Sequence, residues 1–311
     1  MSARSSGDVL SVNRRHTRLE RLRTLGQVLG INKTMLFALP AVAFILAIFI
    51  YPFLYGLVLS FTPSSHEGVF GNYIAFFTDS FLRDSIWYTL RVAFPGAIVA
   101  VLFAIPISFQ VRTIFGVPQR TMLIVLTMPM TFGGVLLSEG LLNFFGTRGW
   151  LNRFLMFIGL TDGPIRLTYN YWGVFIAEIV GGIPVAVLLI SSFLNGIDER
   201  LNLAAATLGA KPLTRLRTIT LPLLLPGIFV AMTLTFVFAF GVFAAANLVG
   251  QPDRATRVMS IVAYNQGFVH YDYSMAATVT IVMVVVELLA AVVLLTPYAL
   301  LSRHRAPSSK G

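Results

Sequence analysis

The sequence predicts an all-α, polytopic membrane protein with six transmembrane helices, and three observations lead to this fold class. Apolar residues make up 56% of the 311 residues, whereas charged residues make up only 12%, about half of what a soluble domain carries. Six apolar segments are each longer than the roughly 20 residues that a helix needs to cross a bilayer. Lys and Arg are concentrated in alternate connections between these segments, as in proteins with cytoplasmic basic loops.

Residues 1–34 precede the first apolar segment and are basic, with seven Lys and Arg against Asp8 and Glu20. Leucines recur at helical spacing, so we expect a cytoplasmic arm at the membrane surface. A signal-peptide n-region is disfavoured because the apolar segment that follows is too long and no small-residue cleavage site is evident. Residues 302–311 are expected to form a cytoplasmic tail.

The membrane domain is expected to extend over residues 35–301. Its six predicted spans are 35–61, 85–110, 121–145, 171–194, 221–247 and 274–301. Several contain proline, which membrane helices tolerate where neighbouring helices satisfy the freed backbone groups. An even number of spans places both termini on the same side of the membrane.

The basic residues indicate which side is cytoplasmic. The two termini and the connections 111–120 and 195–220 together carry 16 Lys and Arg, whereas the connections 62–84, 146–170 and 248–273 carry 6. The positive-inside rule makes the first set cytoplasmic. The second set is rich in aromatic residues, which favours anchoring in membrane lipid at the interface; a docking surface for an extracytoplasmic partner is the alternative.

The cytoplasmic connection 195–220 contains signals for a short helix at 198–210. Asp198 is a suitable N-cap, and Glu199 places a negative charge in the first turn. No Gly or Pro interrupts the residues up to Gly209, which can take the left-handed conformation that ends a helix. Pro212 suits the first turn of a second segment. These signals alone favour an ordinary amphipathic connector.

The spacing within this connection is more specific. Two alanines are followed after three residues by a glycine, and after nine more by isoleucine, any residue, leucine and proline; the residues are Ala204, Ala205, Gly209, Ile219, Leu221 and Pro222. This pattern resembles the cytoplasmic loop of permease subunits of binding-protein-dependent type I ABC importers. Leu203 departs from it, because the family usually has Glu at this position.

The resemblance implies a set of partners. They are two ATPase subunits, a second permease subunit and an extracytoplasmic solute-binding protein, in the inner membrane of a bacterial cell. The ATPase would contact the coupling residues Leu203, Ala204, Ala205, Gly209 and Ala210. ATP and Mg²⁺ would bind to the partner subunits, so no cofactor is expected on this chain. Leu203 favours a heterodimer in which the other permease carries the standard loop.

The resemblance also bears on the solute. Leu208 precedes Gly209 where the sugar branch of the family usually has Asp, so the loop looks more like the polyamine, phosphonate and ferric-ion branch. The implied function is that of a permease subunit that forms the translocation pathway.

Four ionisable residues lie inside the predicted spans, where charges are costly and usually face the bundle interior. They are Arg91, Glu139, Glu178 and Glu287. Counted along straight spans, the first three lie about 10 Å below the outer surface. We therefore predict at least one ion pair among them. The alternative function for these four residues is to line the translocation path.

Other function classes find no support in the sequence. There is no GxxxxGK[ST], HExxH or GxSxG motif, no cysteine, and the four histidines are far apart in sequence. We therefore expect no enzyme activity and no metal site, and the net charge of +10 is explained by the basic loops without nucleic acid. An ion- or proton-coupled secondary transporter is the alternative function, although the inverted repeats typical of that class are not visible.

Overall fold

The structure, a computed structural model, describes residues 33–62, 68–114 and 116–303. These residues are helical with connecting turns and contain no strand, which confirms the all-α prediction. The predicted arm 1–34 and tail 302–311 lie outside the described residues except at their inner ends. The chain divides into two units, Met1–Val58 and Leu59–Gly311. The described residues of the first unit belong to helix α2 (Lys33–Ser60), a 28-residue apolar helix with Pro40 and Pro52 inside it, whose last two residues fall in the second unit.

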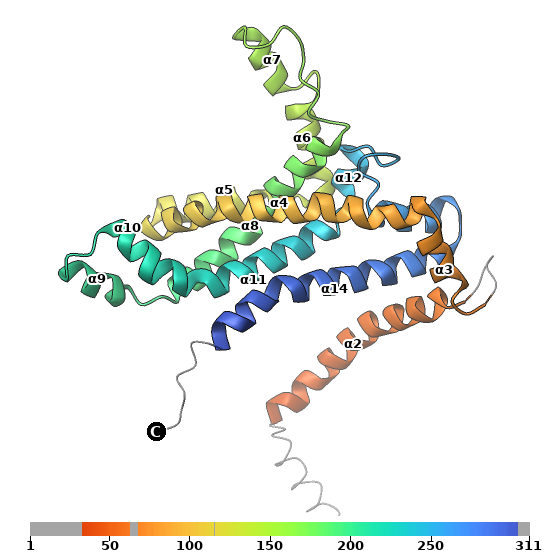
Figure 1. Cartoon of the computed structure of the whole chain (residues 1–311), viewed down its shortest axis with the longest axis horizontal. Helices are drawn as coiled ribbons and strands as arrows, with labels where there is room; N and C mark the ends of the chain where they lie inside the picture. Colours follow the sequence, from red (N-terminus) through yellow and green to blue (C-terminus); the bar gives the residue numbers. More distant parts are fainter. Residues whose placement is uncertain (1–32, 63–67, 115, 304–311) are drawn as a thin grey trace, which may run out of the picture. The chain divides into compact units, whose positions relative to one another are not determined.

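The second unit contains the remaining helices (Figure 1). They are α3 (Gly71–Thr78), α4 (Ser80–Thr113), α5 (Val117–Thr131), α6 (Gly133–Phe145), α7 (Trp150–Phe157), α8 (Tyr171–Asn195), α9 (Glu199–Thr207), α10 (Pro212–Arg215), η1 (Leu216–Thr220), α11 (Leu221–Phe240), α12 (Ala244–Leu248), α13 (Met259–Tyr264), η2 (Asn265–Val269) and α14 (Tyr273–Arg303). In the described residues, five helices are long and apolar enough to cross a membrane. A sixth span is present if α5 and the segment formed by α6 and α7, which are bent relative to each other, are counted together as one span.

Helices α4, α8 and α11 pack side by side at the centre of this unit (Figure 1). Small residues recur every third or fourth position along α4 and are fully buried: Ala93, Ala97, Ala100 and Ala104. A β-carbon on Gly182 of α8 would lie 3.1 Å from Ala100 and 3.0 Å from the Thr235 methyl of α11. Small side chains at such crossings allow membrane helices to approach closely.

The third predicted span, 121–145, is not a single straight helix. It is divided into α5 and α6, and the bent pair turns by 102° at the break. Pro129 removes one backbone donor from α5 and its ring crowds the preceding turn. Gly133 then has a φ of +68°, a left-handed conformation that glycine adopts without steric cost. The hydrophobic pattern continues through the break, which is why the sequence indicated one span.

The fifth predicted span, 221–247, also has different bounds. The helix begins earlier, because α10, η1 and α11 follow one another without interruption from Pro212 to Phe240. Segment η1 is a π-helical turn in which the Leu221 N–H bonds to the Leu216 carbonyl. Pro222 has no N–H to continue the α-helical pattern, and such a turn accommodates it. At the other end the helix stops at Gly241, and residues 244–248 form the separate helix α12.

Candidate functional site

The spacing pattern of the loop begins on α9 and the turn that follows it, and ends on η1 and the start of α11. The Asp198 carboxylate accepts a hydrogen bond of 2.9 Å from the Arg200 N–H, so Asp198 is the N-cap as predicted. Glu199 occupies the first turn, where its negative charge opposes the positive end of the helix dipole. The predicted short helix is therefore confirmed in its position and its cap.

Gly209 ends this helix in the left-handed conformation, with φ +80°. Its N–H donates to the Ala206 carbonyl, and the Ala210 N–H donates to the Ala205 carbonyl, both at 3.0 Å. This pair of bonds is the Schellman arrangement, which satisfies the last carbonyls of a helix and requires a residue that tolerates positive φ. The predicted glycine stop is confirmed. It determines the direction in which the chain leaves α9.

Two side-chain contacts hold α9 against the start of the next helix. The Arg215 Nη1 donates to the Asn202 carbonyl at 3.2 Å, and the Thr220 hydroxyl donates to the Asn202 Oδ1 at 3.3 Å. Arg215 is half-buried and Thr220 is buried. Arg215 thus connects two helices, so the position of α9 is fixed by side-chain contacts.

Arg112 fixes the other end of the loop, and the sequence analysis did not single it out. Its guanidinium donates to the Leu194 carbonyl at 2.9 Å and to the Ile197 carbonyl at 3.2 Å. These carbonyls end α8, and a cation at a helix C-terminus stabilises the negative end of the dipole. The available signal was a basic residue in the last turn of α4. Arg112 thus links α4 to the segment from which α9 begins.

The outward face of α9 is uncovered. None of its residues is buried, and the side chains of Leu203 and Leu208 are 59% and 88% exposed. Ala204 and Gly209 are also exposed, whereas Ala205 and Ala210 are half-buried. The five predicted coupling residues therefore lie on one short, capped segment. Its exposed apolar side chains could contact another protein.

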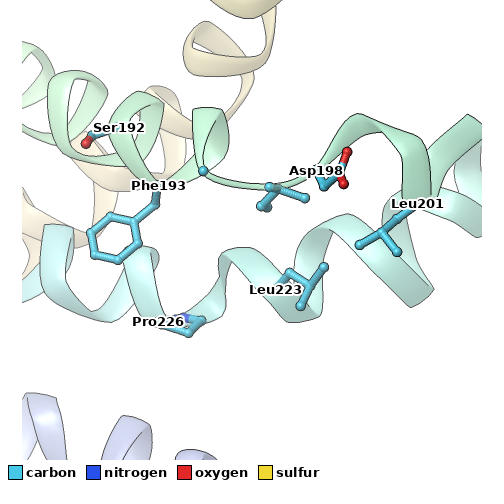
Figure 2. A pocket seen from close by; sticks show the side chains of 8 residues that line it. Ser192, Phe193, Asp198, Leu201, Leu223 and Pro226 are labelled. Carbon is cyan, nitrogen blue, oxygen red and sulfur yellow. The ribbon is translucent and has the colours of Figure 1, made fainter.

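An open groove of about 570 Å³ lies where α8, α9 and α11 meet (Figure 2). Figure 2 shows Phe193 above Pro226, and Leu201 of α9 near Leu223 of α11. The residues that line it are Ser192, Phe193, Gly196, Ile197, Asp198, Leu201, Leu223 and Pro226. Leu201 is the α9 residue that reaches the groove, so the exposed residues Leu203 and Leu208 do not line it.

The predicted ion pair among Arg91, Glu139 and Glu178 is wrong. Within residues 33–62, 68–114 and 116–303 the salt bridge found is Arg83 with Asp84, at 3.5 Å on the surface. The Arg91 guanidinium instead lies over the Tyr171 ring, 5.2 Å from its centroid, and the Tyr171 hydroxyl donates to the Arg91 carbonyl at 3.0 Å. Glu139 is exposed on α6. Because the chain bends by 102° before α6, the depth of Glu139 cannot be counted along a straight span.

Glu178 lies inside the bundle, with 6% of its surface exposed. A β-carbon on Gly96 of α4 would lie 3.2 Å from the Glu178 β-carbon, so this side chain packs where α4 meets α8. Its Oε2 atom has no hydrogen-bond partner among the described residues. Glu287 is half-buried on α14. The structure therefore does not bring the four ionisable residues together. Within its described part, no cluster of three His, Asp or Glu side chains is placed to hold a metal ion.

We expect the substitution Glu178→Gln to leave the stability of the protein unchanged or slightly higher. The described structure gives Glu178 no cationic partner, and a neutral amide of the same size is cheaper to bury than a carboxylate. The measurement is the thermal unfolding midpoint of the purified protein in detergent. Gly96→Val is the matched control on the facing helix and should lower the midpoint, because its side chain would crowd Glu178. A marked loss of stability in Glu178→Gln would contradict this account.

Known proteins resemble this chain in both sequence and fold. The molybdenum transport permease protein ModB of Escherichia coli (strain K12) is 33% identical over 171 residues, which is 53% of this chain and 72% of ModB. The chain belongs to the family of permease subunits of binding-protein-dependent ABC importers. The spermidine/putrescine transport system permease protein PotB of Haemophilus influenzae is 28% identical over 165 residues, or 53% of this permease. The permease spans only 58% of that PotB. No protein-family model matches it.

A solved structure supports the same fold for this permease. A bacterial alginate ABC transporter in complex with alginate pentasaccharide-bound periplasmic protein contains a chain that matches with a TM-score of 0.73. The match covers 89% of the permease and 96% of that chain, at 20% identity. A likeness at this identity concerns the fold alone. It agrees with the helices found here and with the predicted ABC permease architecture.

Proposed function

We propose that this permease forms the translocation pathway of an ATP-driven importer and receives the motion of partner ATPase subunits through α9. The observation that carries the proposal is the construction of the loop. A short helix is capped at Asp198, stopped at Gly209 and braced through Asn202, yet it leaves Leu203 and Leu208 exposed. A helix that is fixed at its base and uncovered on its outer face suits insertion into a partner.

The proposed assembly has two ATPase subunits, which bind ATP and Mg²⁺, a second permease subunit and an extracytoplasmic solute-binding protein. The alginate transporter described above was solved with a periplasmic protein bound, which supports a binding protein as one partner. Leu203 at the usual glutamate position favours a second permease of different sequence. Closure of the ATPases would pull α9 and switch the bundle as rigid bodies between two states.

We further propose the inner membrane of a bacterial cell as the location, with both termini and the coupling loop in the cytoplasm. The support is the unequal distribution of Lys and Arg between the two sets of connections. The proposed solute is a small polar molecule, with a polyamine, a phosphonate or ferric ion favoured over a sugar. The similarity to PotB supports a polyamine. Arg91, Glu139, Glu178 and Glu287 stay candidates for the path.

Cysteine cross-linking tests the proposed coupling surface. The chain has no cysteine of its own, so a single cysteine at Leu203 or Leu208 can react at that position alone. We expect both variants to cross-link to the ATPase subunit of the assembly, because these side chains are exposed on α9 and at its C-cap. A cysteine at Phe157, which is 87% exposed on α7, is the matched control and should not cross-link to it.

The same approach reports the orientation. An impermeant thiol reagent applied to intact cells with a permeable outer membrane should label a cysteine at Pro252 but not one at Lys211. Labelling at Lys211 alone would reverse the assigned topology. Cross-links to the ATPase from Phe157 but not from Leu203 or Leu208 would disprove the coupling role of α9.

A further inference from the structure

A pocket of about 410 Å³ lies beyond the end of α11 that is opposite to the coupling loop. Its lining comes from the turn after α11, from α13 and η2, and from the first turns of α14. The lining includes Phe243, Ser260, Tyr264, Phe268, Tyr273 and Thr280. The volume is within the range of small-molecule sites.

Three of its four aromatic rings form a continuous wall. The Phe243 and Tyr264 ring centroids are 5.1 Å apart, and the Tyr264 and Phe268 rings are stacked at 5.0 Å. Tyr264, Phe268 and Tyr273 are 45%, 65% and 57% exposed, so the rings are not sealed in the core. Aromatic faces carry partial negative charge and attract cations placed over them.

The backbone holds this wall close to α14. Segment η2 is a π-helical turn, and such turns often occur at functional sites. A β-carbon on Gly267 would lie 3.3 Å from the Ala276 β-carbon, so η2 approaches α14 tightly. Tyr271, in the turn between them, has a φ of +58°, which is an uncommon conformation for a non-glycine residue. The positions of Phe268 and Tyr273 are therefore determined by a constrained turn.

The polar groups of the pocket also favour a positively charged ligand. The Ser260 hydroxyl donates to the Val242 carbonyl, and the Thr280 hydroxyl donates to the Ala276 carbonyl at 2.9 Å. With their protons used in this way, both oxygens have only lone pairs left for a ligand, and a lone pair accepts from an N–H. The described residues that line the pocket include no Lys, Arg or His. Beside these acceptors and the π faces, the only other side-chain polar groups of the described lining are the Tyr264 and Tyr273 hydroxyls, which can donate as well as accept. Without a cationic side chain, this lining suits a cation better than an anion.

We propose that this pocket binds a small organic ammonium ion as the imported solute enters or leaves the permease. The inference rests on the proposed function, because it names the solute class of that importer. The inference favours an amine over an oxyanion as the solute, because an aromatic pocket of this kind suits an amine and gives no charge partner to an oxyanion. Cation–π contacts without a carboxylate hold a ligand weakly enough to release it, which a transport pathway requires.

The test is equilibrium binding of radiolabelled putrescine to the purified full chain in nanodiscs made of phosphatidylglycerol. We expect saturable binding that unlabelled spermidine and tetramethylammonium compete away. Uncharged 1,4-butanediol, which matches putrescine in length, should not compete, and neither should sulfate. The double variant Tyr264→Leu with Phe268→Leu should bind at least about tenfold more weakly, because two cation–π contacts are lost.

Two sets of controls separate ring chemistry from folding. Tyr264→Phe and Phe268→Tyr keep both rings and should bind putrescine like the parent. Phe157→Leu removes a more exposed ring outside the pocket and should have no effect. Full binding by the double leucine variant, or equal competition by 1,4-butanediol, would overturn the proposal. Binding of putrescine that disappears in phosphatidylethanolamine nanodiscs would also overturn the proposal, since the ammonium group of the lipid would then occupy the pocket.

Failure of this inference can be distinguished from failure of the proposed function. If cells that contain the chain and its partner ATPase take up some other solute in an ATP-dependent way while no ammonium ion binds, only the ammonium site is wrong. If no cross-link from α9 to the ATPase forms and no ATP-dependent uptake is found, the importer function itself is wrong, whatever the pocket binds.

Discussion

Gly209→Val is expected to reduce ATP-driven uptake at least tenfold while the protein still accumulates in the membrane. Gly209 has a φ of +80°, and a β-carbon added there would meet no atom within 4 Å. The effect therefore comes from the backbone alone. For L-residues the left-handed conformation costs on the order of 1–2 kcal/mol, and a β-branched residue tolerates it least. Valine should unwind the Schellman turn and change the direction of α9 relative to its partner.

The measurement is uptake of labelled solute in cells that also contain the ATPase and binding protein, normalised to the amount of permease in the membrane. Gly209→Asn is the matched control, because asparagine adopts positive φ more readily than other side chains. It should retain most of the uptake. Normal uptake by the valine variant would show that the glycine stop is not required, and equal loss in both variants would point to a contact instead of the backbone.

Gly227→Val is expected to lower the stability of the protein markedly. A β-carbon on Gly227 of α11 would lie 2.4 Å from the Cγ and 2.5 Å from the Cβ of Phe193 on α8. These atoms are at the base of the side chain, so Phe193 cannot avoid the contact by moving its outer ring edge. Overpacking of this kind typically costs about 1–3 kcal/mol. The thermal unfolding midpoint in detergent should decrease, and uptake should decrease with it.

A second substitution identifies the cause. Phe193→Gly removes both the ring and the β-carbon that would be crowded, so the double variant with Gly227→Val should recover part of the unfolding midpoint lost in Gly227→Val alone. Phe193→Ala keeps the β-carbon and should rescue less. Gly140→Val on α6 is the matched control, because the space beside Gly140 is open, and it should behave like the parent. A Gly227→Val protein of unchanged midpoint, or one that Phe193→Gly does not rescue, would contradict the packing seen between α8 and α11.

The parts of this fold that could be predicted from the sequence are those that local chemistry determines. The cap at Asp198, the stop at Gly209 and the second helix starting at Pro212 depend on residues within a few positions of each other. The role of this segment is a different matter, since its contact with an ATPase stays a prediction. The spacing pattern and the similarity to ModB lead to the same family.

The features of the structure that could not be predicted depend on contacts between residues distant in sequence, or on breaks within apolar segments. Arg112 bonds to carbonyls more than 80 positions away, which no local pattern indicates. The charge pairing failed because equal distance along straight spans does not hold once the chain turns at Gly133. It also failed because Arg91 found an aromatic partner, Tyr171, in place of a carboxylate. Hydropathy treats a bent segment and a straight one alike.

The unbroken run from Pro212 to Phe240 has a mechanical consequence. A helix of 29 residues is a rod of about 43 Å, longer than the apolar thickness of a bilayer. Its N-terminal end is held to α9 by the hydrogen bonds to Asn202. Its C-terminal end stops at Gly241, two residues before Phe243. For a rigid rod of this length, a small tilt at the end held to α9 moves the other end sideways by a larger distance. We therefore expect that a push on the loop, as the proposed function requires, would change the shape of the aromatic pocket.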